Sequence, residues 1–184
     1  MKIVVLEGLP MIGKTTIINY IKTLNIKEVY VVEELISSTK ELDQKSFMIN
    51  DIKKMRKYKS GLVIIDRGPI STLSYNEMLN KLGNNPNLED VYKWFNIFGI
   101  PFCNRNDVYT YYLCSNEKKL RIEDINSPNG SICNQMELEK ITIKNIKKYC
   151  RNYEIRNYMK NEMEVFVNEI IDKYLQSWWN NKPL

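Results

Sequence analysis

The feature that most constrains this chain is a glycine-bounded loop near its start, Gly8 to Thr15, which fits the pattern G-x-x-x-x-G-K-[ST]. An apolar segment at 2–6 precedes the loop, and the residues after Thr16 place isoleucines and a leucine on one face of a helix. The glycines let the loop curl so that successive backbone N–H groups point at one anion, and the positive end of the helix lies at the same point. A strand–loop–helix unit that binds a nucleoside triphosphate is therefore predicted.

The side chains of the loop complete this predicted site. Lys14 supplies a mobile positive charge near the β- and γ-phosphates, and the Thr15 hydroxyl is placed to bind Mg²⁺. ATP and Mg²⁺ are the expected cofactors. The residues expected to contact ATP are Gly8, Pro10, Met11, Ile12, Gly13, Lys14, Thr15 and Thr16.

Strands and helices alternate along the rest of the chain. Further strands are predicted at 28–32, 62–66, 107–114 and 153–158. Apolar residues with helical spacing lie between them, which predicts one α/β domain over residues 1–184: a three-layer fold with a parallel five-stranded sheet and helices on both faces. The polar segment 115–135 follows the fourth strand and suits a short mobile lid.

Two of the predicted helices carry more specific expectations. The first opens at 38–41, which has capping-box spacing. Its inner face is formed by Phe47, Met48, Ile52 and Met55. The basic residues in its last turns, among them Lys54, are explained by favourable charge at a helix C-terminus. The second helix carries Trp94 and Phe95 in an aromatic stripe and is expected to stop at 99–101. Such a stripe usually packs in the core, and a stacking wall for a flat ring is the alternative.

The sequence contains no histidine, which limits the chemistry. Ser-His-Asp triads, Cys-His pairs and ordinary zinc sites are excluded, since the four cysteines also lack C-x-x-C spacing. A net charge of +5, from 27 basic and 22 acidic residues, suits an anionic small molecule but is too small to indicate long nucleic acid. No segment has the length of a membrane span, and Glu7 interrupts the first apolar run too early for a signal peptide. A cytoplasmic protein without a membrane partner is expected.

Polar groups end three of the predicted strands. The first strand ends in the phosphate loop, the second in Glu33 and Glu34, and the third in Asp66 and Arg67. Ligands bind beyond the carboxyl ends of the strands in an open parallel sheet, so these groups should face one crevice. An acid there can hold Mg²⁺ or accept a proton from an attacking hydroxyl, and Arg67 can clamp an anionic acceptor or the transferring phosphoryl group.

Two segments resemble thymidylate kinases. Glu7-Gly8 followed by Gly13-Lys14-Thr15-Thr16 is similar to the loop E-G-x-x-G-x-G-K-T-T, and residues 66–76 are similar to D-R-Y-x-x-S-x-x-A-Y-Q. Deoxynucleoside kinases share the fold and an acid–arginine–serine motif at the third strand. The resemblance implies a P-loop NTPase fold, with Asp66 as an acid on the Mg²⁺ or acceptor side and Arg67 as a clamp. It also implies an acceptor pocket lined by Ser71, Tyr75 and Asn76, the last in the place of the family's glutamine.

The segment after the second strand departs from thymidylate kinases. Residues 32–36 lack the arginine and glycines of R-E-P-G-G. Deoxynucleoside kinases place a glutamate there, in E-P, that activates the sugar hydroxyl, and Glu34 can match it. Lys118, Lys119 and Arg121 fit the R-x-x-x-R lid of either family only loosely. Pro10 is similar to the proline in the G-x-P-G-x-G-K loops of polynucleotide and small-molecule kinases, so the acceptor stays open.

The function favoured by these residues is that of an ATP-dependent nucleoside or nucleotide kinase with a small-molecule acceptor. The expected catalytic residues are Lys14, Glu34, Asp66, Arg67 and Arg121, and Glu33 is expected to help bind the acceptor. A kinase for a sugar, an antibiotic or a polynucleotide 5′ end is the alternative. A GTPase switch or a non-catalytic NTP-binding protein is less favoured, because D-x-x-G is missed at 66–69 and no N-K-x-D occurs. Pairing into a homodimer is left open.

Overall fold

A parallel five-stranded sheet forms the centre of the computed structural model, which describes residues 1–34, 44–83, 87–114 and 132–179. The strand order is β2-β3-β1-β4-β5, and every neighbouring pair is parallel. The strands are β1 (Lys2–Gly8), β2 (Val29–Val32), β3 (Leu62–Asp66), β4 (Val108–Cys114) and β5 (Tyr153–Asn157). The five predicted strands and the α/β class are confirmed.

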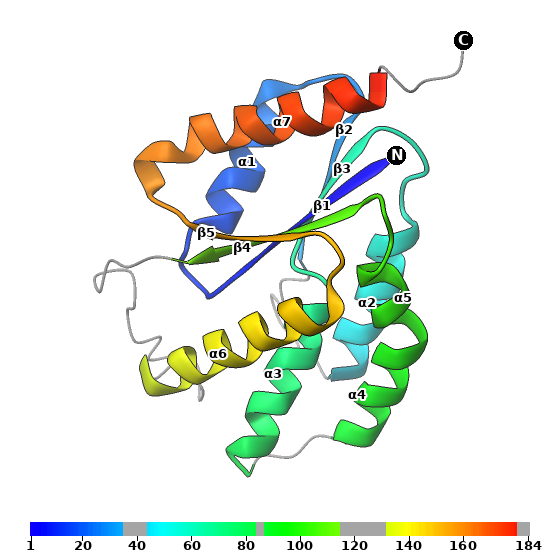
Figure 1. The fold of residues 1–184 in the computed structure, drawn as a ribbon, viewed down its shortest axis with the longest axis vertical. Helices are drawn as coiled ribbons and strands as arrows, with labels where there is room; N and C mark the ends of the chain where they lie inside the picture. Colours follow the sequence, from blue (N-terminus) through cyan, green and yellow to red (C-terminus); the bar gives the residue numbers. More distant parts are fainter. Residues whose placement is uncertain (35–43, 84–86, 115–131, 180–184) are drawn as a thin grey trace.

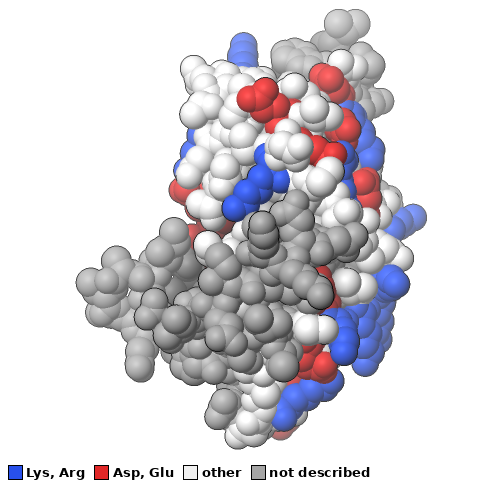
Figure 2. All heavy atoms as spheres, turned by 90° about the vertical axis from the view of Figure 1, so that its left-hand side faces the viewer, with Lys and Arg blue, Asp and Glu red and all other residues white. Residues whose placement is uncertain are grey.

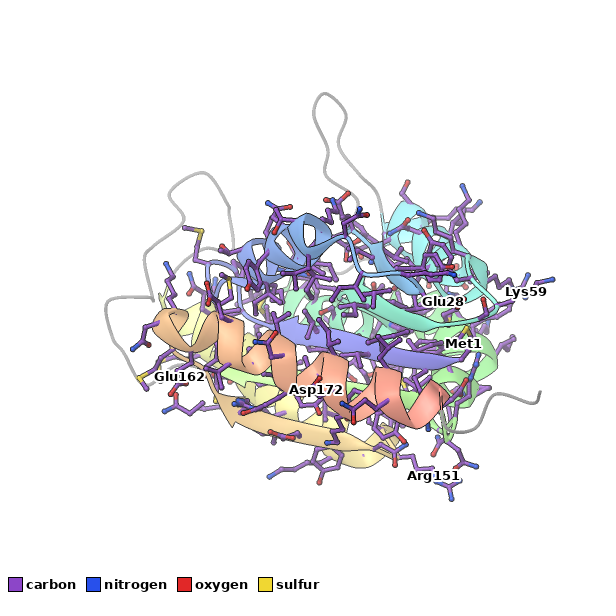
Figure 3. The ribbon with its side chains drawn as sticks, turned by 90° about the horizontal axis from the view of Figure 1, so that it is seen from above. Met1, Glu28, Lys59, Arg151, Glu162 and Asp172 are labelled. Atoms are coloured by element: carbon purple, nitrogen blue, oxygen red, sulfur yellow. The ribbon has the colours of Figure 1, made fainter. Side chains whose placement is uncertain are left out.

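The parallel arrangement brings the carboxyl ends of the strands to one edge of the sheet. Met1, Glu28, Lys59 and Arg151 each precede a strand, and Figure 3 shows them together at one end of the molecule. Glu162, which follows β5, lies at the opposite end. The predicted crevice therefore belongs to the end that carries Glu162.

Helices cover both faces of the sheet, as predicted (Figure 1). One face carries α1 (Lys14–Leu24) and α7 (Met163–Trp179). The other carries α2 (Gln44–Arg56), α3 (Pro69–Lys81), α4 (Leu88–Trp94), α5 (Ile100–Cys103) and α6 (Ile132–Tyr149). Successive residues of a strand point to opposite faces, so Val4 and Leu6 join the core under α1 and α7, while Ile3 and Val5 join the other core.

The prediction that the aromatic helix stops at 99–101 is wrong, because the helix continues to Cys103. After α4, residues Phe95–Gly99 form one wide π-helical turn in which the Ile100 N–H donates to the Phe95 carbonyl, and α5 follows without a break. Pro101 lies in the first turn of α5 and has no N–H, so it donates no hydrogen bond to the π-helical turn that precedes it. Trp94 and Phe95 are buried in the core, so their expected packing role is confirmed.

Some expectations fall outside the described residues. They are the capping box at 38–41 and the larger part of the lid candidate, 115–131, which includes Arg121. Residues 132–135, the remainder of that candidate, begin α6. Within the described ranges, no helix is both long and apolar enough to cross a membrane.

Candidate active site

The phosphate loop leaves β1 and enters α1 through three residues with positive φ. These are Gly8 at 143°, Met11 at 64° and Gly13 at 104°. A Cβ at Gly8 would lie 2.5 Å from the Leu113 carbonyl oxygen, so a close approach to β4 requires a glycine there. A Cβ at Gly13 would lie 3.3 Å from the ring of Tyr158, just after β5. The glycines of the pattern therefore fit the loop against β4 and against the residue that follows β5.

Lys14 is folded over the loop. Its Nζ donates to the carbonyl oxygens of Gly8 and Leu9, at 2.7 and 2.8 Å. The residue is only 5% exposed, and this burial, aided by the positive charge of Arg67, lowers its pKa to about 7. A phosphate in the loop would supply the negative charge that the two carbonyl oxygens do not.

A cavity of about 520 Å³ opens beside the loop at the carboxyl edge of the sheet. The predicted site residues that line it are Pro10, Met11, Gly13, Lys14, Thr15, Thr16, Glu33, Glu34, Asp66 and Arg67. Ile12 packs instead in the core beneath α1, and Gly8 closes the end of β1 behind the loop. The structure thus brings the three predicted strand ends to one cavity.

Three residues that sequence reasoning did not assign to the site also line this cavity. They are Ile18 of α1, Phe47 of α2 and Lys160, which follows β5. Phe47 was expected on the core-facing side of its helix and lies on the cavity wall, where its ring offers a flat apolar surface. Lys160 adds a third cationic side chain to those of Lys14 and Arg67.

Asp66 ends β3 inside the cavity. The residue is 7% exposed, and its buried Oδ1 has no hydrogen-bond partner among the described residues. Burial raises its pKa, while the charges of Lys14 and Arg67 lower it. An orphaned carboxylate oxygen in the same cavity as the Thr15 hydroxyl fits Mg²⁺, which prefers oxygen ligands. In the part of the chain that the structure describes, no three carboxyl or thiol groups lie close enough together to hold a metal ion. Phosphate oxygens would therefore have to supply the remaining ligands of Mg²⁺.

Lys54 of α2 was explained by favourable charge at a helix C-terminus, and the structure shows buried contacts that this explanation did not include. The residue is 4% exposed, and its Nζ donates to the carbonyl oxygens of Asp66 and Arg67. The same nitrogen forms ion pairs with Glu34 and Asp51. A signal was present in the sequence, because Asp51 and Lys54 have i, i+3 spacing within the apolar face of the helix.

The two glutamates after β2 lie differently. Glu34 accepts a hydrogen bond from Asn50 Nδ2 at 3.1 Å in addition to its ion pair with Lys54. Glu33 is half exposed and forms an ion pair with Lys22 of α1. Glu34 is therefore held by two residues of α2, while the more exposed Glu33 is held by α1.

Glu7 has a bracing role that the sequence did not reveal. It is fully buried, and its carboxylate accepts from the Gly68 N–H at 3.0 Å and from the Ser71 hydroxyl. Burial raises its pKa to about 7, although both hydrogen bonds lower it. Ser71, predicted to bind the acceptor, thus lies behind the turn that carries Asp66 and Arg67, outside the cavity lining.

The other two predicted acceptor residues also lie on α3, away from the cavity lining. Asn76 is fully buried, and its Nδ2 donates to Gln44 Oε1 and to the Thr72 carbonyl, both at 2.7 Å. Its Oδ1 is buried without a partner among the described residues. Tyr75 is half buried on the same helix. Their binding role stays a prediction.

Figure 2 faces the carboxyl edge of the sheet. Over the coloured part of this face, acidic and basic side chains lie next to one another. Such mixed charge suits a small anionic ligand bound in a cavity better than a long polyanion, which needs an extended basic surface.

No protein-family model matches the sequence, and no curated protein is similar to it. Solved structures do resemble the fold. The thymidylate kinase of Candida albicans has a TM-score of 0.66 at 13% identity, over 94% of this chain and 91% of that chain. A deoxyadenosine kinase from M. mycoides with bound dATP has a TM-score of 0.63 at 16% identity, over 92% and 99% of the two chains. The Bacillus subtilis protein YorR, in complex with phosphorylated GDP, has a TM-score of 0.61 at 11% identity over the full length of both chains.

At these identities the likeness establishes the fold. The chain has the three-layer fold seen in thymidylate kinase and deoxyadenosine kinase, as its sequence resemblance implied.

Proposed function

We propose that this protein is an ATP-dependent kinase of the nucleoside and nucleotide class, which transfers the γ-phosphoryl group of ATP to a small acceptor. The observation that carries the proposal is the single cavity in which the phosphate loop, with Lys14, meets Asp66 and Arg67. The fold shared with two such kinases supports it.

In the donor half of the site, the backbone N–H groups of the loop and the N-terminus of α1 bind the β- and γ-phosphates. Lys14 exchanges its hydrogen bonds to the Gly8 and Leu9 carbonyls for phosphate oxygens. Thr15 and Asp66 would hold Mg²⁺, which when bound neutralises the charge that develops on the phosphate oxygens. Binding and charge neutralisation are the main contributions expected from the protein, since phosphoryl transfer depends largely on both.

In the acceptor half, a hydroxyl oxygen attacks the γ-phosphorus, and the bond from this phosphorus to the β–γ bridging oxygen breaks to release ADP. Glu34 takes the proton of the hydroxyl, because the free oxygen of Asp66 suits the cation better. Arg67 stabilises the charge of the transferring group. Phe47 lines the same cavity as Glu34, and its ring favours an acceptor with a flat base.

The proposal includes a cytoplasmic location. A homodimer is left open, and sedimentation velocity on the purified protein measures whether two copies pair.

Release of ADP tests the function. Purified protein with ATP and Mg²⁺ is offered thymidine, thymidylate, other nucleosides and nucleotides, and hydroxyl compounds such as sugars and aminoglycosides. We expect at least one nucleoside or nucleotide to raise turnover well above the background hydrolysis of ATP. Lys14→Ala and Asp66→Asn should each lower that turnover at least about 100-fold while the protein stays folded.

A response confined to a sugar or an antibiotic would replace the proposed acceptor class by the alternative one. Near-normal turnover in Lys14→Ala or Asp66→Asn would refute the proposed mechanism.

A further inference from the structure

A buried ammonium group that takes no part in the proposed transfer lies directly beside the cavity residues. Lys54 is 4% exposed, and oxygen atoms from three segments of the chain surround its Nζ. The carbonyl oxygens of Asp66 and Arg67 lie at 2.9 and 3.2 Å. Glu34 Oε2 lies at 2.9 Å and Asp51 Oδ1 at 3.6 Å. The three N–H donors of the group are thus matched by the two carbonyls and Glu34, while Asp51 adds negative charge.

The two carbonyl oxygens belong to a backbone turn that needs support. Arg67 has a φ of 55°, a left-handed conformation that a residue with a Cβ keeps only where surrounding contacts hold it. The Arg67 N–H donates to the Leu6 carbonyl at 3.0 Å, which fixes one side of the turn. Lys54 fixes the turn through two successive carbonyl oxygens. The conformation of this turn decides where the Asp66 carboxylate and the Arg67 guanidinium point.

The surroundings of Lys54 are arranged for a charge at this position. Thr72 Oγ1 donates to Asp51 Oδ2 at 2.7 Å, which orients the carboxylate whose other oxygen faces Lys54. Burial raises the pKa of Asp51 to about 7, and the charge of Lys54 opposes this rise. Asp51 and Lys54 are the two buried residues of α2, so this helix directs charged side chains as well as its methionines toward the protein interior.

We propose that Lys54 is the positioning residue of this site: its ammonium group holds the Asp66–Arg67 turn and the Glu34 carboxylate in one fixed arrangement around the bound phosphates. Lys54 acts through these groups and touches no substrate. Because one nitrogen binds both carbonyls and the carboxylate, loss of that nitrogen frees the cation ligand, the clamp and the proton acceptor together. For its catalytic consequence this inference rests on the proposed kinase function, which it deepens by naming what sets the geometry of the acceptor half.

The test compares Lys54→Met with Lys53→Met, its exposed neighbour on the same helix. For each folded variant, kcat, the dissociation constant for ATP and the amide exchange rate at Arg67 are measured. We expect Lys54→Met to lower kcat at least about 100-fold, since misplacement of catalytic groups by about 1 Å has effects of this size. Its dissociation constant for ATP should stay within about threefold of wild type, because the phosphate loop is untouched, and Lys53→Met should match wild type throughout.

The amide exchange measurement does not depend on catalysis. The Arg67 N–H should exchange at least about tenfold faster in Lys54→Met than in Lys53→Met, while amides in the middle of β3 keep their rates. If wild type transfers no phosphoryl group to any acceptor, the proposed function fails, and this exchange rate alone decides the positioning role. Equal exchange in the two variants, or wild-type kcat in Lys54→Met, would overturn it.

Lys54→Arg covers the case in which Lys54→Met does not fold. This variant keeps the charge, but its planar guanidinium cannot bring one nitrogen within reach of both carbonyl oxygens and Glu34. We expect a kcat lowered about tenfold, with the affinity for ATP retained. A kcat equal to that of wild type would refute the requirement for a single central nitrogen.

Discussion

Lys14 is the side chain of the cavity whose ionisation a bound phosphate should change most. It donates to two carbonyl oxygens and is almost fully buried, and this burial lowers its pKa to about 7. A triphosphate places several negative charges beside the amine and favours its charged form. The pKa of Lys14 should therefore rise toward its ordinary value when ATP binds.

We expect ATP binding to take up a proton at pH 8 and almost none at pH 6. At pH 8 the amine is above its pKa of about 7 and mostly neutral before binding, so charging it absorbs up to about one proton per ATP. At pH 6 it is already charged. Calorimetric titration with MgATP in two buffers of different ionisation enthalpy measures the uptake, and Lys14→Met should lose it. The same proton uptake at pH 6 and pH 8 would contradict the attribution of this uptake to Lys14.

Individual site residues could be predicted where the pattern that places them is local. The loop residues and the acids at the strand ends are of this kind. Glu7 is not, because its partners Gly68 and Ser71 are 61 and 64 positions away. Lys54 has one local partner, Asp51, but its contacts with Asp66, Arg67 and Glu34 do not follow from a local pattern. A charged residue is usually exposed, so its burial becomes visible only once the tertiary fold supplies a partner.

At the scale of elements, the wide turn Phe95–Gly99 lets α4 continue into α5 without a break. Gly99 has a φ of −68°, so its backbone conformation does not require glycine. The requirement is steric, because a Cβ at this position would overlap the ring of Phe95. That ring is itself packed edge-on against Tyr149 of α6, with 5.0 Å between the ring centroids. The turn therefore depends on the absence of one methyl group.

Replacement of Gly99 by alanine should lower the free energy of unfolding by about 1–3 kcal/mol, the usual effect of overpacking a buried contact. Ile97→Ala is the matched control: it lies in the same turn but is 64% exposed, and its effect should stay within about 0.5 kcal/mol. Urea denaturation followed by circular dichroism measures both. Equal stability of Gly99→Ala and wild type would mean that the Phe95 ring can move aside without cost.

The bounds of the strands were predictable because short apolar runs, rich in β-branched residues, end at polar groups. The end of the aromatic helix was not, since a glycine followed closely by a proline usually marks a loop. Here Pro101 lies in the first turn of α5, which continues the preceding helical turn, and Gly99 makes room for a ring. The local sequence shows that such residues tend to end a helix, but tertiary packing decides whether the helix ends there.

At the scale of the whole molecule, the two cores lie on opposite faces of one sheet and the cavity lies where the strands end. A ligand that bridges the phosphate loop, β2 and β3 should therefore stabilise the entire fold by mass action.

MgATP at about 100 times its dissociation constant should raise the melting temperature by roughly 5–10 °C. Binding to the folded state alone contributes about 2.7 kcal/mol at this excess, and each kcal/mol shifts the melting temperature of a chain of this size by about 2–4 °C. Differential scanning fluorimetry measures the shift, and Lys14→Ala at the same concentration should show a smaller one. If the melting temperature of the wild-type protein did not change at any concentration of MgATP, tight nucleotide binding would be excluded.

The alternation of strands and helices was enough to predict a parallel sheet with both faces covered. The order β2-β3-β1-β4-β5 did not follow from it, because hydrophobic periodicity indicates which face a residue takes and not which strand lies beside it. The continuous apolar run of β3 is typical of a strand buried on both faces, and β3 does lie between β2 and β1.

Two groups that pack behind the phosphate loop come from residues more than 100 positions further along the chain. The Leu113 carbonyl limits Gly8, and the ring of Tyr158 lies against Gly13. The loop is therefore not a portable module. A β1–loop–α1 segment grafted into another protein would keep the sequence pattern but lose its contacts with Leu113 and Tyr158. The pattern would still predict a phosphate site, but the grafted loop should bind phosphate more weakly.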